Sequence, residues 1–138
     1  MFTCEIPIRF NDVDHARIVY YPHFYHFCHI AMEEFFARDV GVAYHDLIDR
    51  DGIGLPTVHV EGDFAAPVTF GQTLRMGVEL LRMGNTSMTL QFTATRIGDE
   101  VVVFRGSVTM VAVDMKDFKP MRMPDHYRAA IEKLRPAS

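Results

Sequence analysis

The segment from Pro22 to Val40 most constrains the fold of this chain, because it is long, apolar on one side and free of glycine and further proline. Proline suits the first turn of a helix, where its missing N–H costs nothing. Apolar residues then recur at helical spacing until Gly41 ends the segment. The pattern predicts one long amphipathic helix whose apolar face contains Phe24, Phe27, Cys28, Ala31 and Phe35.

Strand patterns lie on both sides of this helix. Residues 2–10 alternate between apolar and polar side chains, as in a strand with one buried face. Segments rich in Val, Thr, Phe and Met predict four further strands, at about 55–65, 73–83, 87–97 and 101–115. The last three should form an antiparallel meander, with Gly98-Asp99 as a tight hairpin turn, and short helices are expected at 43–49 and from Pro124 to about Leu134.

One long helix and four or five antiparallel strands predict an α+β fold in which the sheet wraps around the helix. A chain of 138 residues fits a single domain, which we expect to span 1–138. A sheet of this kind leaves edge strands open, and a second copy can close one of them. A homodimer is therefore the minimum expectation.

The composition excludes several classes of partner. The 14 Lys and Arg against 18 Asp and Glu give a net charge of -4, which argues against nucleic acid. The first residues lack the basic and apolar stretches of a signal peptide, and no apolar run is long enough to span a bilayer. We therefore expect a cytoplasmic protein that does not bind membranes, in which Cys4 and Cys28 are buried thiols rather than a disulfide.

Two carboxylates, Asp12 and Asp14, follow the first predicted strand and precede the long helix. A helix N-terminus offers unpaired N–H groups and the positive end of the helix dipole, so it can stabilise an oxyanion. A carboxylate beside such donors can attack a carbonyl carbon or activate water. The spacing alone fits a solvated turn or a helix-capping group equally well.

The run from Phe10 to Asp14, followed by the run from Ile18 to Phe24, resembles the signature of the 4-hydroxybenzoyl-CoA thioesterase family and its Tol-Pal-associated relatives. The order of strand, loop, long helix and strand meander extends the resemblance over nearly the whole chain, including a segment similar to the second strand of the family at Gly54-Leu55-Pro56. The resemblance implies the hotdog fold, in which a curved antiparallel sheet surrounds one helix.

The resemblance also implies an activity. The chain would hydrolyse an aromatic or a short-to-medium acyl-CoA, with active sites at the interface of a homodimer that pairs into a homotetramer. Asp14 matches the catalytic carboxylate of the family, and the Tyr21 N–H matches the donor that polarises the thioester carbonyl. Asp14 would act as nucleophile or as general base, and no cofactor or metal is expected.

Two segments depart from the family pattern. Where many members have a small residue and then glycine, this chain has His15, Ala16 and Arg17, and a glycine there would reach a positive φ. His15 and Arg17 are candidate substrate-binding residues, and Arg17 either meets an anionic part of the substrate or is solvated. At the turn expected to bind the CoA phosphates, the candidate residues are Arg82, Asn85, Thr86 and Ser87.

Several other residues are candidates for the acyl pocket. His29 matches a family position that reaches the acyl end of the substrate across the dimer interface, and His59 could line the same pocket. Leu55 and Pro56 are expected at its mouth. His23, His26 and His29 are three apart and drift around the helix, so they do not predict a metal site.

Two alternatives to an acyl-CoA thioesterase stay open at this point. One is a thioesterase that takes its acyl group from acyl carrier protein, and the other is a non-catalytic acyl-CoA binding module. Asp14 disfavours the second, because a carboxylate near a bound thioester has no obvious binding role.

Overall fold

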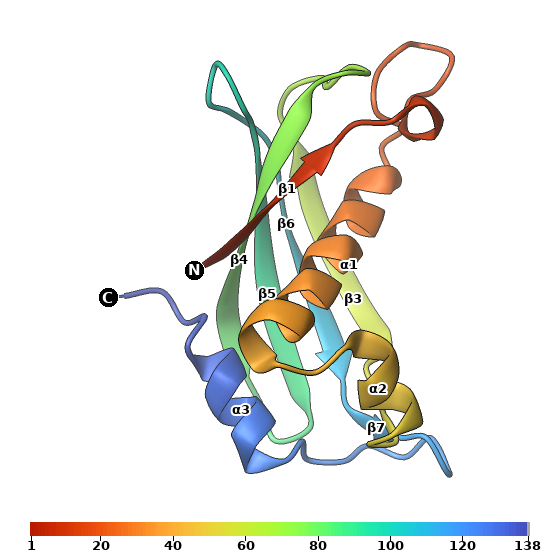
Figure 1. Ribbon diagram of the computed structural model, residues 1–138, viewed down its shortest axis with the longest axis vertical. Helices are drawn as coiled ribbons and strands as arrows, with labels where there is room; N and C mark the ends of the chain where they lie inside the picture. The colour runs from red at the N-terminus through yellow and green to blue at the C-terminus, as the bar shows by residue number, and fades with distance from the viewer. Residues whose placement is uncertain (138) are drawn as a thin grey trace.

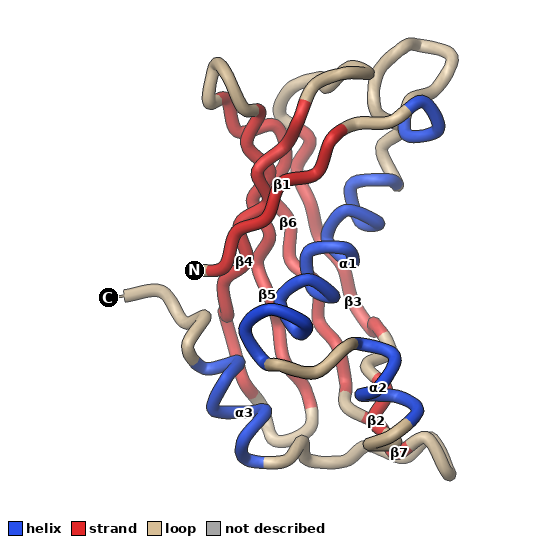
Figure 2. Tube along the Cα trace, viewed as in Figure 1, coloured by secondary structure: helices blue, strands red, loops and turns tan. Residues whose placement is uncertain are grey.

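The computed structural model describes residues 1–137. A five-stranded antiparallel sheet with the strand order β1-β4-β5-β6-β3 curves around the long helix α1, as Figures 1 and 2 show. This arrangement confirms the predicted α+β class and the sheet-around-helix architecture. The strands of the sheet are β1 (Phe2–Pro7), β3 (Thr57–Phe64), β4 (Thr73–Met83), β5 (Ser87–Arg96) and β6 (Val101–Val111).

The long helix forms where the sequence predicts it. α1 spans His23–Phe35 and continues through one π-helical turn, η2 (Phe36–Val40), to Gly41. Gly41 has a φ of 85°, a left-handed conformation that favours glycine and ends the helix. The shorter helices α2 (Tyr44–Asp49) and α3 (Asp125–Glu132) also lie within their predicted segments.

The ends of two predicted strands differ from the structure. β1 stops at Pro7 because Phe10–Asp12 turn into a short 3-10 helix, η1. The last strand is interrupted after Val111, and a separate strand β7 (Val113–Asp114) pairs with β2 (Ile53–Gly54) in a second, two-stranded sheet. The strand predicted at about 55–65 therefore pairs with β6 only from Thr57 onward.

The core lies between the apolar face of α1 and the concave face of the sheet. All five predicted face residues of the helix are buried. The Phe24 ring stacks on Phe104 of β6, with centroids 5.0 Å apart and planes 14° apart. Buried aromatic pairs of this kind add to the free energy gained from burying apolar area, so this contact fixes the first turn of α1 on the sheet.

Strand β3 is an open edge of the sheet, since it pairs only with β6. None of its residues is fully buried, and three large apolar side chains on it are exposed: Val58 at 61%, Val60 at 43% and Phe64 at 47%. An open edge with exposed apolar side chains is a template for pairing with another strand. In contrast, the opposite edge strand, β1, alternates strictly between buried and exposed residues.

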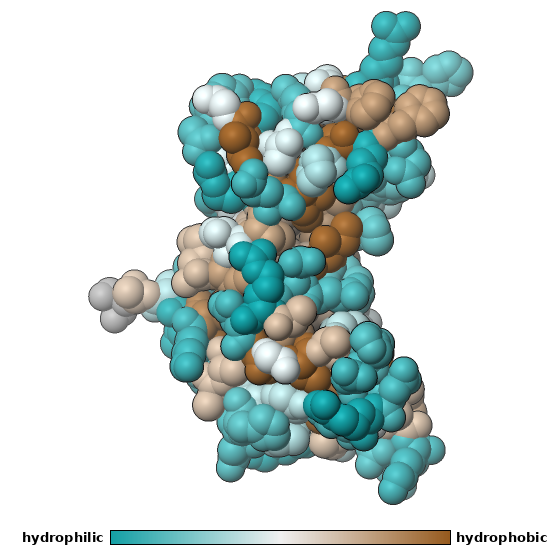
Figure 3. Space-filling view, viewed as in Figure 1, coloured by the Kyte–Doolittle hydropathy of each residue, from teal (hydrophilic) through white to brown (hydrophobic). Residues whose placement is uncertain are grey.

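Hydrophilic residues predominate on the face that carries α1, and apolar residues reach the surface there in small separate patches (Figure 3). Among residues 1–137, no helix is long and apolar enough to cross a membrane.

We predict that Phe104→Ala lowers the free energy of unfolding by about 3 to 5 kcal/mol, because it opens a cavity under α1. Urea denaturation followed by circular dichroism measures this change. Phe70→Ala is the control, since this ring is 60% exposed, and we expect a change within about 0.5 kcal/mol. Equal losses for the two variants would contradict the central place of the Phe24–Phe104 contact.

Candidate active site

The segment between β1 and α1 folds back on itself through a β-bridge between Val13 and Val19. The Asp14 N–H donates to the Ile18 carbonyl at 3.0 Å, and the Tyr20 N–H donates to the Asp12 carbonyl at 2.9 Å. We call residues 12–20 the acidic loop. It lies at the end of the sheet where α1 begins (Figure 1).

Asp12 is a structural residue of this loop. Its side chain is buried, its Oδ2 accepts the Arg9 N–H at 2.8 Å, and its Oδ1 lies 3.2 Å from Nδ1 of His23. Because His23 is the first residue of α1, this carboxylate connects the loop to the start of the helix. Both oxygens of Asp12 therefore have a partner within the protein.

Asp14 has a different environment. It is exposed, and its Oδ1 accepts the Ala16 N–H at 2.8 Å, a turn that asparagine and aspartate side chains often form. Within residues 1–137 the Asp14 carboxylate forms no ion pair, and its Oδ2 accepts no hydrogen bond. Spacing alone does not distinguish the two aspartates. Within residues 1–137 the structure does, because Asp14 is exposed and its Oδ2 has no hydrogen-bond partner, whereas Asp12 is buried and both of its oxygens have one.

Arg17 has a φ of 68°, the left-handed conformation that a glycine would adopt more easily. The Arg17 N–H donates to the Asp14 carbonyl at 2.9 Å, so this conformation closes the turn that carries Asp14. The side chains of His15 and Arg17 are exposed beside that turn. The loop therefore keeps a backbone suited to glycine although the residue is arginine.

Tyr21 supplies an available backbone donor at the start of α1. Its neighbours are bonded, since Tyr20 donates to Asp12 and His23 donates to the Tyr20 carbonyl. The Tyr21 N–H has no acceptor within the described part of the chain. Tyr21 lines a groove of about 310 Å³ between the acidic loop, α1 and the segment after β3. Other lining residues include Ile18, Phe24, Phe64, Ala66 and Pro67.

A second cavity, of about 170 Å³, lies farther along α1 between the helix and the sheet. Its lining is mostly apolar, and His29, Tyr25 and Thr57 are its polar members. His29 Nε2 lies 2.8 Å from Oε2 of Glu33, and the ring also contacts Tyr44. The structure thus places His29 in a cavity beside the helix, together with Cys28, Met32, Val60, Phe92, Val108 and Met110.

Cys28 lines this cavity as a protonated thiol. Burial raises the pKa of Cys28 to about 12, and it raises the pKa of Cys4 to about 11. A thiol with so high a pKa is a poor nucleophile at neutral pH, because the thiolate is the reactive form. Both cysteines are free.

His59 does not line this cavity. A β-bulge between Thr57 and His59 shifts the alternation of β3, so that Thr57 and Val60 both face the cavity. His59 pairs in register with Thr109, on the opposite face of the sheet, and its Nε2 lies 2.9 Å from Oε1 of Glu61. Strict alternation along the strand would have missed this shift.

The turn between β4 and β5 carries the residues predicted to bind CoA phosphates. Asn85, Thr86 and Ser87 surround a small cleft together with Leu55, while Arg82 is exposed at the end of β4. Arg128 of α3 also reaches this turn and donates to the Gly84 and Asn85 carbonyls at 3.1 and 3.2 Å. Sequence reasoning missed Arg128, because it is 44 residues from Gly84 and only the docking of α3 brings them together.

The acidic loop and this turn lie at opposite ends of the molecule (Figure 1). The loop follows β1, which pairs with the Thr73 end of β4, and the turn follows the Met83 end. At a rise of about 3.3 Å per residue, β4 separates them by roughly 33 Å. Pro56 lies beside Leu55 at the same end as the turn, where its carbonyl accepts the Val111 N–H.

Of the three histidines of α1, His23 and His26 are ring neighbours with centroids 6.3 Å apart, while His29 has other partners. His23 contacts Asp12, His29 contacts Glu33, and the His26 side chain is exposed. Among residues 1–137, no group of three His, Cys, Asp or Glu side chains is placed to hold a metal ion.

Comparison with known proteins gives a consistent result. The sequence model of the thioesterase-like superfamily matches residues 8–131. A 1,4-dihydroxy-2-naphthoyl-CoA hydrolase from Nostoc punctiforme is 27% identical over 124 residues, which cover 90% of this chain and 82% of that protein. The crystal structure of a thioesterase superfamily protein from Jannaschia sp. CCS1 is 30% identical, with a TM-score of 0.89 and coverage of 99% and 94%. A gentisyl-coenzyme A thioesterase is 25% identical, with a TM-score of 0.84 and coverage of 94% and 99%.

The two aspartates should differ in their effect on stability. Asp12→Asn replaces one acceptor oxygen by an NH2 group, which cannot accept a hydrogen bond from the Arg9 N–H or from an N–H at Nδ1 of His23, so we expect a loss of about 1 to 3 kcal/mol in the free energy of unfolding. Asp14→Asn keeps an oxygen for the Ala16 N–H and should change it by less than about 0.5 kcal/mol. Denaturant titration measures both, and a larger loss for Asp14→Asn would reverse the two roles.

Proposed function

Because this chain belongs to the thioesterase-like superfamily, we propose that it hydrolyses aromatic acyl-CoA thioesters, with Asp14 as the catalytic carboxylate. Acyl-CoA thioester hydrolysis itself follows from the family and from the activities named for its relatives. The observation that carries the assignment of Asp14 is the combination of a carboxylate oxygen with no partner and an unpaired Tyr21 N–H at the start of α1.

The proposed chemistry needs only these two groups and water. Asp14 either attacks the thioester carbon, which releases CoA thiolate and leaves a mixed anhydride for water to cleave, or it takes a proton from a water that attacks the same carbon. In both routes negative charge develops on the carbonyl oxygen. The Tyr21 N–H, at the positive end of the α1 dipole, would stabilise that charge.

The cavity beside α1 favours an aromatic acyl group. Its volume of about 170 Å³ suits one ring, since an apolar cavity of about 150 Å³ takes up benzene. His29, Tyr25 and Thr57 are the groups in its wall that could hydrogen-bond a ring hydroxyl. The relatives that act on dihydroxynaphthoyl-CoA and gentisyl-CoA fit a hydroxylated ring.

One copy of the chain does not bring the proposed parts together. Asp14 and the turn with Arg82, Asn85 and Ser87 are separated by the length of β4, and Asp14 is exposed. The groove at Tyr21 and the cavity at His29 are also separate. We therefore propose that the active site forms between two copies.

Pairing of two β3 strands would supply the second copy. Two-fold symmetry makes the joined strands antiparallel, so the Phe64 end of one copy lies beside the Thr57 end of the partner subunit. The groove of one copy, which reaches Phe64, would then open toward the partner's cavity, which reaches Thr57. Asp14 and Tyr21 would act on a thioester whose ring lies in that cavity.

The same pairing places the β4–β5 turn of the partner subunit near the acidic loop. Arg82 would meet the phosphates of CoA, with Thr86 and Ser87 as further donors. Arg128 would hold the turn through its two bonds to backbone carbonyls. Further pairing of dimers into a tetramer is part of the proposal.

We predict that Asp14→Asn lowers kcat for a hydroxybenzoyl-CoA by on the order of 10²-fold to 10⁴-fold, because asparagine can neither attack nor accept a proton. Thiol release from a panel of acyl-CoAs and an acyl carrier protein thioester measures the rate. Asp117→Asn is the matched control, since Asp117 is also exposed and accepts the N–H two residues on, from Lys119 at 3.1 Å. It should keep the wild-type rate.

The results of this assay distinguish an acyl-CoA thioesterase from a carrier-protein thioesterase and from a binding module. An active Asp14→Asn variant would remove Asp14 from the mechanism. Preference for the carrier-protein thioester would change the substrate class, and a wild-type protein that binds but cleaves no thioester would support a binding module.

A mixing experiment tests the shared site. Asp14→Asn and His29→Trp, which fills the mouth of the cavity, should each be inactive alone. When equal amounts are unfolded and refolded together, about half of the dimers should be hybrids, and each hybrid contains one intact site of two. The mixture should therefore recover about one quarter of the wild-type activity. A mixture that stays inactive, or sedimentation of the wild type as a monomer, would contradict a site formed between copies.

A further inference from the structure

The groove at Tyr21 has a wall formed by the segment between β3 and β4, residues 65–72, which we call the groove loop. Ala65, Ala66, Pro67 and Val68 line the groove. This loop also holds the acidic loop, because the Val68 carbonyl accepts the Val19 N–H at 2.8 Å. Val19 in turn forms the β-bridge with Val13, the residue before Asp14.

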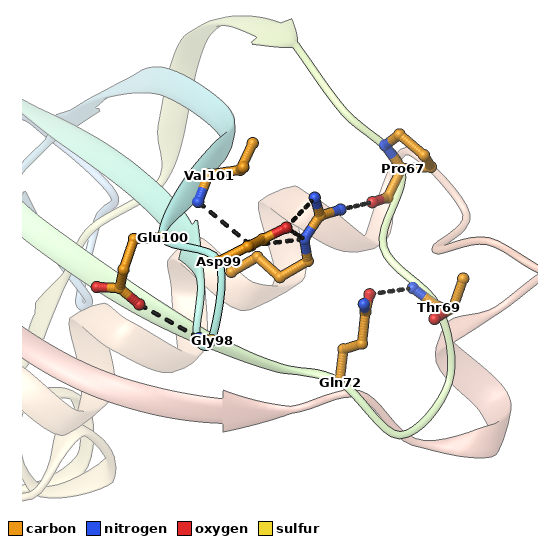
Figure 4. Close-up of polar contacts among 8 residues, drawn as sticks. Pro67, Thr69, Gln72, Gly98, Asp99, Glu100 and Val101 are labelled. Carbon is orange, nitrogen blue, oxygen red and sulfur yellow. Dashed lines mark hydrogen bonds and ion pairs between the residues drawn. The ribbon is translucent and has the colours of Figure 1, made fainter.

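Arg96, at the end of β5, connects the groove loop to the sheet. Its Nη1 donates to the Pro67 carbonyl at 2.7 Å, and its Nη2 donates to Oδ2 of Asp99 at 2.6 Å. Its Nε lies 3.0 Å from both oxygens of Asp99. Figure 4 shows Pro67 and Asp99 on either side of this guanidinium group, whose side chain is only 18% exposed.

This contact differs from an ordinary surface ion pair. Asp99, in the β5–β6 turn, orients the guanidinium fork, and one remaining N–H points to a backbone carbonyl in a loop 29 residues away. A planar fork held by a carboxylate on one side fixes the direction of its other donors. The Asp99 carboxylate also neutralises the charge of Arg96. Arg96 therefore affects the groove by holding the loop in place rather than by its charge.

Other bonds hold the far end of the groove loop. The Thr69 N–H donates to Oε1 of Gln72 at 2.8 Å, and the Ile8 N–H donates to the Gln72 carbonyl at 2.8 Å. These contacts secure residues 69–72, next to β1. At the Pro67 end, the Ala65 and Ala66 N–H groups donate to the Val103 carbonyl of β6 at 2.8 and 3.4 Å. Within residues 1–137, the Arg96 bond is the side-chain hydrogen bond that joins this end of the loop to the sheet, and it acts on the next residue, Pro67.

We propose that Arg96 is a positioning residue for the proposed hydrolysis: by fixing the Pro67 carbonyl it sets the position of Val68, and through the Val68–Val19 bond it sets the acidic loop and Asp14. The inference rests on the proposed role of Asp14. Small displacements of a reacting group cost large factors in rate, since catalysis requires the attacking oxygen within about 3 to 3.5 Å of the carbon.

The test compares Arg96→Gln with Arg75→Gln. Arg75 is the matched control because its Nη1 binds Oε1 of Glu100 at 2.7 Å in the same β5–β6 turn, without a contact to the groove loop. We expect Arg96→Gln to lower kcat by on the order of tenfold to a hundredfold with little change in KM, and Arg75→Gln to keep the wild-type kcat. Arg96→Lys, which can reach the Pro67 carbonyl without forming the fork, should recover part of the loss.

Amide hydrogen exchange provides a readout that does not depend on activity. Exchange of the Val19 N–H should accelerate in Arg96→Gln and stay unchanged in Arg75→Gln. A kcat of Arg96→Gln within twofold of wild type, equal losses in both arginine variants, or unchanged Val19 exchange would each overturn the inference. Asp14→Asn is assayed alongside: if it is inactive while Arg96→Gln is fully active, only the role of Arg96 is wrong, whereas an active Asp14→Asn removes the proposed role of Asp14 itself.

Discussion

The contact between the aromatic face of α1 and the concave face of the sheet determines where the candidate residues at the start of α1 and along it lie. Phe24 stacks on Phe104 in the first turn of the helix, and Phe27 and Phe35 are buried in later turns. A helix anchored in this way is a rigid rod with a rise of 1.5 Å per residue. Core packing therefore sets the position of the Tyr21 N–H, just before α1, and of His29, within α1.

The two aspartates of the acidic loop, Asp12 and Asp14, have different surroundings. Asp12 is buried and joins Arg9, after the end of β1, to His23, the first residue of α1. Within residues 1–137, Asp14 keeps one oxygen without a hydrogen-bond partner. A buried carboxylate with complete hydrogen bonding gives stability and shape. Within the described part of the chain, the exposed Asp14 carboxylate contributes to the fold through its bond to the Ala16 N–H, and it is this carboxylate that we propose for the chemistry.

Local signals in the sequence predicted most of the fold. The long helix, its end at Gly41 and the meander of β4, β5 and β6 follow from spacing and turn residues within short segments. The family resemblance, and not the spacing, singled out Asp14 and Tyr21. Features created by contacts between distant segments stayed hidden: the bulge that turns His59 away from the cavity, the pairing of β2 with β7, and the bonds of Arg96 and Arg128 to backbone carbonyls 29 and 44 residues away.

The open edge at β3 connects stability to function. Exposed valines and a phenylalanine on an edge strand promote aggregation in a monomer, and proteins usually cover such an edge or protect it with charge. In this chain the same strand borders the groove at one end and the cavity at the other. If two copies pair through this edge, as we propose, the pairing would cover the exposed apolar side chains and assemble the proposed site in one step. The surface that is costly in a monomer would then be the surface on which the site forms.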